Sequence, residues 1–214
     1  MDSPEDAGCK SYVFSSDTKL SVPSPSEDWQ AWATRRGGTA ADLTTIRLTL
    51  QGRSTNSVVL HGLRVGVESR SRPKGATYDL GLSCGGITPR HFEVDLDGPK
   101  AVAAPRAGDD GTPAVNFPYR ISSTEPEVFL VHARTGTCDC RFHLNLDWTS
   151  GDRKGTLRIA DGKSPFRVIG TQQLRLFELD MDKQQWVKQS GADTVPGAEL
   201  GRQAQRSADR RETA

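Results

Sequence analysis

Four cysteines, Cys9, Cys84, Cys138 and Cys140, carry the most versatile chemistry in this sequence. Cys138 and Cys140 are two residues apart in an alternating segment, so both side chains should face the same side of a strand. Cys84 lies in the run Ser-Cys-Gly-Gly, a loop that can approach another backbone closely. We favour disulfides, in which Cys9 and Cys84 each reach one of the close pair or bond to each other. A strained bridge between Cys138 and Cys140 is a further pairing.

Two other states of the cysteines remain open. Buried free thiols pack as small apolar side chains. A zinc site could combine Cys84, Cys138 and Cys140 with His143. However, His143 lies an odd number of residues from both Cys138 and Cys140, so in a regular strand its imidazole faces away from them. Disulfides imply an oxidising compartment. The expected location is therefore extracytoplasmic or at the cell surface, with the cytoplasm as the alternative if the thiols are free.

Two further groups of side chains could face a ligand. Trp29 and Trp32 share one face by helical spacing and could form a binding platform, although packing of a short helix onto the main domain is favoured. His91 alternates with apolar residues beside the acidic residues Asp95 and Asp97, a pattern typical of a solvated strand face. No cofactor is expected from any of these groups.

Catalytic signatures are scarce. The sequence has no His-Glu-x-x-His, no phosphate-binding glycine loop and no dinucleotide fingerprint. A hydrolase acting through carboxylates such as Asp95, Asp97 or Asp147 is the alternative to a protein without catalytic activity. Asp95 and Asp97 could also join Asp109 and Asp110 in a calcium site, but their spacing fits no known calcium loop.

Composition and charge argue against several functions. The chain has 214 residues, with 28 basic and 27 acidic side chains and a net charge of +1. No strong field therefore favours nucleic acid or an anionic membrane as a partner. An apolar run of about 18 residues, the least needed for a membrane span, is also absent. Hydrophobic residues make up 35% of the chain, which suffices for a globular domain.

The elements that would position these residues begin with a helix. The region 25–36 is predicted to be helical, with Ser24 as the capping residue, Pro25 at the first helical position and Glu27 three residues after the cap. Two glycines follow and should end the helix.

After this helix the hydrophobic period changes from 3.6 to 2, which predicts about eight or nine short strands. In the clearest alternation, 138–148, the expected core residues are Phe142, Leu144, Leu146 and Trp148. The residues expected to be exposed there are Arg141, His143 and Asn145. The run 128–133 should be a buried central strand, and 97–116 a long surface excursion. The predicted fold is an all-β antiparallel β-sandwich, immunoglobulin-like or related, with one short N-terminal helix.

Three regions are expected along the chain. Residues 1–24 should form an N-terminal extension, which is acidic and lacks the apolar stretch of a signal peptide. Residues 25–188 should form the helix and β-sandwich domain. Residues 189–214 should be a flexible tail, because they contain too little apolar surface to offset ordering.

Seven short runs carry a resemblance to a known group of proteins: CGGITPRHF at 84–92, VDLD at 94–97, FPYR at 117–120, EPEV at 125–128, CDC at 138–140, LDWTS at 146–150 and PFR at 165–167. From about residue 9 to residue 186 the chain resembles an uncharacterised actinobacterial family. The resemblance implies a β-rich module, and longer members carry an N-terminal helix-turn-helix domain and a membrane helix ahead of it. It implies no catalytic residue. Both upstream parts are expected to be missing here, and an extracytoplasmic location follows only by analogy.

The sequence thus predicts a non-catalytic β-sandwich that binds or senses an unknown protein or glycan ligand. Nucleic acid is not an expected partner, and no membrane span is expected in this chain. The alternatives are a hydrolase that uses surface carboxylates, and a regulatory accessory domain of a helix-turn-helix system.

Overall fold

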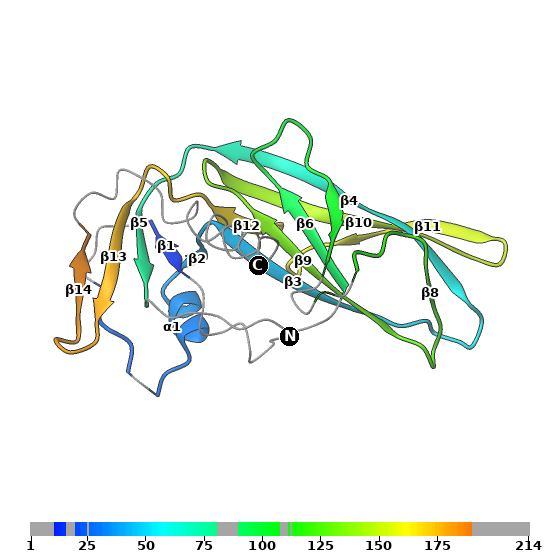
Figure 1. Ribbon diagram of the computed structural model, residues 1–214, viewed down its shortest axis with the longest axis horizontal. Coiled ribbons are helices and arrows are strands. Elements are labelled where there is room, and N and C mark those ends of the chain that lie inside the picture. The colour runs from blue at the N-terminus through cyan, green and yellow to red at the C-terminus, as the bar shows by residue number, and fades with distance from the viewer. Residues whose placement is uncertain are drawn as a thin grey trace, which may run out of the picture.

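A computed structural model describes residues 11–15, 20–24, 26–80, 90–107, 111 and 113–189. Within them the chain forms three β-sheets and one helix (Figure 1). The predicted all-β fold with a single short helix is confirmed. One sheet and the helix lie at one end of the molecule, and the hairpin of β10 and β11 projects at the other (Figure 1).

Two sheets face each other and form the sandwich. In the β10 sheet the order is β11-β10-β4-β8, with β12 also paired to β10; its strands are β4 (Val58–Ser71), β8 (Tyr119–Ile121), β10 (Asp139–Ser150), β11 (Arg153–Ile159) and β12 (Phe166–Ile169). In the β9 sheet the order is β3-β9-β6-β7; its strands are β3 (Leu43–Leu50), β6 (Arg90–Asp95), β7 (Ala103–Arg106) and β9 (Glu127–Arg134). The main core lies between them and joins Phe142 and Leu144 of β10 to Phe129 and Val131 of β9.

The β9 sheet confirms one strand prediction and corrects another. β9 lies between β3 and β6, and Phe129, Val131 and Ala133 are fully buried, as expected for a central strand. The pairing of β6 with β9 is parallel, which was not foreseen. The segment 97–116 is not wholly a surface excursion, because β7 pairs antiparallel with β6 and buries Ala103 between the sheets.

The predicted faces of β10 are confirmed in their alternation. Phe142, Leu144 and Leu146 are buried and Arg141 is exposed. Trp148 is only partly buried, near the projecting end of the hairpin. The other two residues expected to be exposed, His143 and Asn145, are partly buried as well. The imidazole of His143 lies against Gly66 of β4, where a Cβ would collide with its ring, so the missing side chain makes room for it.

The third sheet, the β5 sheet, carries a separate aromatic core. Its order is β14-β13-β5-β1-β2, and its strands are β1 (Tyr12–Phe14), β2 (Thr39–Ala40), β5 (Ala76–Asp79), β13 (Arg175–Asp180) and β14 (Gln185–Lys188). Helix α1 (Trp29–Arg35) packs on it through Trp29 and Trp32, whose rings stack with centroids 4.6 Å apart. Tyr78 of β5 meets Trp186 of β14 edge to face.

The helix is shorter than predicted and has a different capping residue. It begins at Trp29, and the carboxylate of Asp28 accepts a hydrogen bond from the backbone N–H of Ala31 at 2.8 Å. Ser24 instead accepts a backbone bond from Glu27 in a preceding turn, at 2.9 Å. Both Ser24 and Asp28 are good capping residues, and the cap adjacent to the first buried tryptophan is the one used.

The structure can be compared with the predicted domain boundaries at two places in the chain. β1 comes from the region expected to be an extension, yet all three of its residues are buried and it pairs with both β2 and β5. The described chain continues to Gln189, just past the expected end of the domain, and the expected flexible tail otherwise lies outside the described residues.

Candidate binding groove

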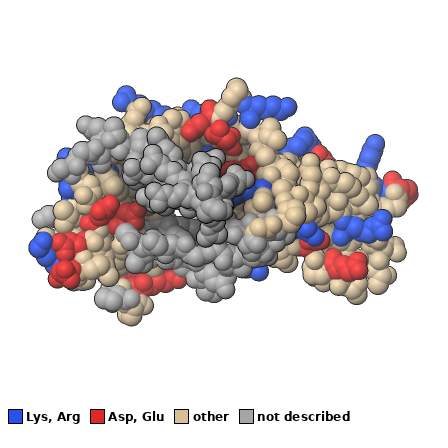
Figure 2. Space-filling view, viewed as in Figure 1, with Lys and Arg blue, Asp and Glu red and all other residues tan. Residues whose placement is uncertain are grey.

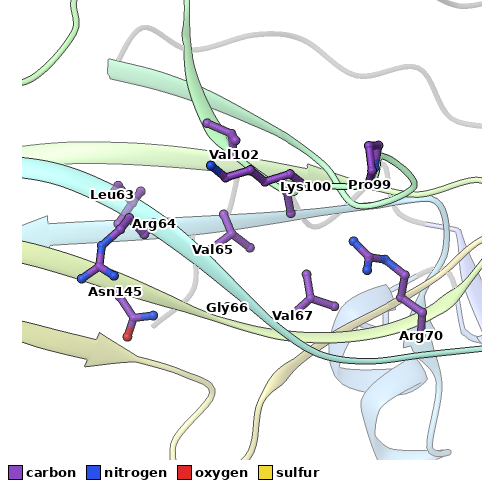
Figure 3. A pocket seen from close by; sticks show the side chains of 11 residues that line it. Leu63, Arg64, Val65, Gly66, Val67, Arg70, Pro99, Lys100, Val102 and Asn145 are labelled. Atoms are coloured by element: carbon purple, nitrogen blue, oxygen red, sulfur yellow. The ribbon is translucent and has the colours of Figure 1, made fainter.

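A groove of about 540 Å³ lies along one edge of β4 (Figure 3). β4 pairs with β10 from Val59 to Ser71, but on its other side it pairs with β8 only from Val58 to Leu60. Beyond Leu60 the described strands add a single isolated bridge on that side, from Arg64 to Val102. No described strand therefore pairs with this side of β4 from residue 65 to residue 69, and the backbone donors and acceptors there face the groove.

The floor of the groove is a row of apolar side chains that ends in a cation. Leu63, Val65 and Val67 lie opposite the core residues of β10, so they face the inside of the sandwich. Arg70 lies opposite the buried Cys140 and therefore shares that face. The row becomes more accessible toward Arg70, because Leu63 is buried whereas Val65 and Val67 are only partly buried.

The opposite wall is the connection from β6 to β7, which is fastened at two points. Arg70 donates from Nε to the carbonyl oxygen of Leu96 at 2.9 Å and from Nη2 to that of Gly98 at 3.1 Å. Farther along, Val102 forms the bridge to Arg64. Between these two points the wall stands away from β4 and lines the groove with Pro99, Lys100 and Ala101 (Figure 3).

The carboxylate of Asp97, outside the groove lining, holds this wall in place through hydrogen bonds. Asp97 accepts hydrogen bonds from the hydroxyls of Thr135 and Thr137, both at 2.6 Å, and from the backbone N–H of Gly136 at 2.7 Å. Partial burial raises the pKa of Asp97, but these bonds outweigh it and hold the pKa below its ordinary value. Asp97 thus stays ionised at neutral pH and ties the groove wall to the turn after β9.

The charges that line the groove are all positive. Its ionisable residues are Arg64, Arg70 and Lys100. Arg64 is neutralised by Asp147, whose two oxygens it contacts at 2.7 Å. The bond from Arg64, with a further bond from Thr156, lowers the pKa of Asp147 to about 2. Within the described part of the chain neither Arg70 nor Lys100 forms an ion pair with a carboxylate, so the groove keeps a local positive charge.

The described surface carries charges of both signs. Basic and acidic side chains are interspersed over the visible face of the molecule (Figure 2). Lys100 and Val102 also border a smaller hollow of about 290 Å³, which contains Glu93 and Asp95. Lys100 and Val102 thus line both the groove and this acidic hollow.

The residues expected to face a ligand do not come together. Trp29 and Trp32 lie in the aromatic core, 5% and 0% exposed, and offer no binding platform. Asp95 lines the small hollow. Asp97 accepts hydrogen bonds that hold the groove wall in place. His91 is buried on the outer side of β6. Neither residue therefore shares a site with the tryptophans.

His91 forms a pair with a histidine that sequence reasoning left aside. Its Nδ1 lies 2.9 Å from Nε2 of His132, and Nδ1 of His132 lies 3.2 Å from the hydroxyl of Thr45. The face expected to be solvated is therefore partly occupied by paired imidazoles, and His91 is 6% exposed.

Cys140 of β10 and Cys138, the residue just before that strand, both point into the main core, as predicted, and both are buried. Their sulfur atoms are at disulfide distance and their Cα atoms are 5.3 Å apart. The other two cysteines, Cys9 and Cys84, lie outside the described residues, so the predicted longer-range pairings are untested. His143 projects from the opposite face of β10, and the described residues contain no cluster of three metal-binding side chains.

Sequence reasoning also passed over one hydrolase motif. The run Gly-Leu-Ser-Cys-Gly at 81–85 matches the pattern Gly-x-Ser-x-Gly. That motif acts as a nucleophile elbow where a strand turns directly into a helix of an α/β sheet. The run lies outside the described residues, and the described all-β fold contains no α/β sheet.

The groove is an open sheet edge on a β-sandwich, with an apolar floor and with two cations, Arg70 and Lys100, that form no ion pair with a carboxylate of the described residues. No protein-family profile, no curated protein and no solved structure matches this chain. In the described part of the chain no helix has the length and apolar character needed to cross a bilayer.

Proposed function

We propose that the chain is a non-catalytic binding module whose groove beside β4 takes an anionic segment of a partner protein. The observation that carries the proposal is the lining of the groove. Arg70 and Lys100 lack carboxylate partners among the described residues, and an apolar row leads up to Arg70. A ligand with both apolar and negatively charged groups complements that surface.

The carboxylates support binding rather than hydrolysis. A general acid needs a raised pKa, so that it holds a proton near neutral pH. The pKa of Asp147 is instead lowered to about 2 by Arg64 and Thr156, and that of Asp97 is also held low. Asp147 and Asp97 already accept several hydrogen bonds within the fold. Asp95 lines a separate hollow and does not converge with them.

A protein ligand is favoured over a glycan because of what lines the groove. Sugar rings commonly stack on exposed aromatic side chains, and the residues that line this groove include none. The part of the β4 backbone that no described strand pairs can instead exchange hydrogen bonds with another polypeptide.

We also propose an extracytoplasmic location. Its support is the pair Cys138 and Cys140, whose sulfurs are at disulfide distance. A bond between them would persist in an oxidising compartment and be reduced in the cytosol of most organisms.

The binding proposal can be tested by fluorescence anisotropy with two pools of fluorescein-labelled hexapeptides. One pool alternates Val or Ile with Asp or Glu, and the other replaces the acidic residues with Lys. The acidic pool should bind and the basic pool should not. Binding should weaken as salt rises, because the cations are exposed. Lys100→Glu should weaken binding of the acidic pool about fivefold to tenfold.

The matched control is Lys154→Glu, which reverses an exposed charge on β11 outside the groove. This variant should bind the acidic pool as the wild type does. Equal binding of the two pools by the wild type, or an unchanged affinity in Lys100→Glu, would contradict the proposal.

A further inference from the structure

We propose that the groove captures the carboxy-terminal end of a partner polypeptide, which adds to β4 as a short strand. This inference rests on the proposed binding function and names the part of the partner that enters. Three features of the groove carry it: the backbone of β4 that no described strand pairs, the closure of the groove at both ends, and the cation at the end of its floor.

On its groove side β4 has no described partner strand from residue 65 to residue 69, and most of this stretch belongs to a regular part of β4. From Gly62 to Val67, β4 pairs with β10 residue by residue, and register shifts bound this stretch on both sides. In an antiparallel ladder alternate residues direct their N–H and C=O groups to opposite sides. Half of these groups therefore point into the groove, where an extended peptide can bind them as an additional strand.

Closure of the groove at both ends limits what can enter. At one end Val102 is bridged to Arg64, and at the other Arg70 binds the carbonyl oxygens of Leu96 and Gly98. The stretch of β4 between these contacts, 65–69, is five residues long. At about 3.3 Å per residue it spans roughly 16 Å. A strand that continued in both directions would have to break one of these contacts, whereas a chain end can stop inside.

The charge of the groove selects the carboxyl end over the amino end. Its lining contains Arg70 and Lys100 and no carboxylate that could receive an ammonium group. The guanidinium of Arg70 has five N–H donors. Two of its nitrogens, Nε and Nη2, donate to the groove wall. The remaining donors of Arg70 can bind a terminal carboxylate, an arrangement stronger than a neutral hydrogen bond.

These features also fix the direction of the bound peptide. A carboxylate at Arg70 lies at the carboxyl end of β4, so the added strand runs parallel to β4. The apolar side chain of its last residue then lies over Val67 and that of the residue two places earlier over Val65, because alternate residues share a face. The preceding residues leave the groove on its open side before reaching Val102.

The test compares three forms of the acidic hexapeptide pool on the wild-type protein: the free acid, the carboxy-terminal amide, and the free acid extended by Gly-Ser-Gly-Ser. Amidation and extension should each weaken binding about tenfold or more, because the carboxylate at Arg70 is removed or displaced. Methylation of the backbone nitrogens of the last three residues should also weaken binding about tenfold, since it removes strand hydrogen bonds.

A substitution of Arg70 tests whether this residue binds the terminal carboxylate of the peptide. Arg70→Gln should weaken binding of the free acid more than binding of the amide, so that the difference in affinity between the two forms shrinks, while the control Lys154→Gln should leave that difference unchanged. If the amide and the extended pool bind as well as the free acid, capture of a chain end is wrong and the proposed binding function survives. Tight binding of the methylated pool would refute strand addition. If no form of the pool binds, the proposed function fails and this inference fails with it.

Discussion

The substitution Gly170→Ala should destabilise the protein because it places an atom against a neighbouring backbone. A Cβ at Gly170 would collide with the carbonyl carbon and oxygen of Gly136 and with the backbone nitrogen of Thr137. These are main-chain atoms, so no change of rotamer relieves the collision. The turn that contains Gly136 must move away from Gly170.

The expected cost follows from the bonds that this turn makes. Gly136 N–H and the Thr135 hydroxyl donate to the carboxylate of Asp97 at 2.7 and 2.6 Å. Gly136 also accepts a bond from Gln172 N–H at 3.2 Å. A bond to a charged group contributes about 1.5–3 kcal/mol. Loss or distortion of one such bond, together with residual strain, should lower the free energy of unfolding by about 3 kcal/mol, a large part of the stability of an ordinary domain.

Urea unfolding at neutral pH, followed by tryptophan fluorescence, measures this change. Gly62→Ala is the matched control, because it lies in a strand and its Cβ would have nothing within 4 Å. The control should leave stability unchanged or raise it by up to about 1 kcal/mol. If the collision acts through Asp97, then Asp97→Asn and Gly170→Ala together should cost less than the sum of their separate effects. A Gly170→Ala protein within about 0.5 kcal/mol of the wild type would refute the reasoning.

Two further outcomes are expected. The pKa of Asp147 is lowered to about 2, first by the bond from Arg64 and then by that from Thr156. Its contribution to stability is therefore present above the pKa of the unfolded chain and is lost as pH falls through the folded value. Asp147→Asn should flatten the fall in unfolding free energy between about pH 4 and 2, and an unchanged acid limb would contradict this. Secondly, alkylation of the unfolded, unreduced protein and peptide mapping should leave Cys138 and Cys140 unlabelled, whereas labelling of both would exclude their bond.

The sequence predicted the β10 faces well and the groove not at all, for one physical reason. Alternation is a local property, and it is reliable where a strand is regular, as at Phe142 and Leu144. In β4 the register shifts after Val67, which lies opposite Phe142, so that Ser69 lies opposite Arg141. A regular strand would place Ser69 on the same face as Val67, but the extra residue puts Arg70 there instead. Nothing local in the sequence marks that shift.

The pairing of strands that are distant in the chain also could not be predicted from the sequence. The parallel partners β6 and β9, and β5 and β13, are joined only in the folded chain. The helix was predicted because tryptophan spacing and capping residues are local. Its start was misplaced because the cap was assigned to Ser24, whereas the structure uses Asp28, which lies next to the first residue that the core buries.

The order of strands in the β5 sheet has a consequence for how the chain folds during synthesis. Among the described strands β1 is made before the others and lies between β2 and β5, and β5 in turn pairs with β13, which is made about 100 residues after β5. Trp29 and Trp32 are covered in part by Trp186 of β14, at centroid distances of 5.9 and 6.3 Å. This aromatic surface therefore stays uncovered on the ribosome until β14 emerges. Such long-range closure slows folding and leaves apolar surface of the nascent chain exposed to aggregation until β14 is available.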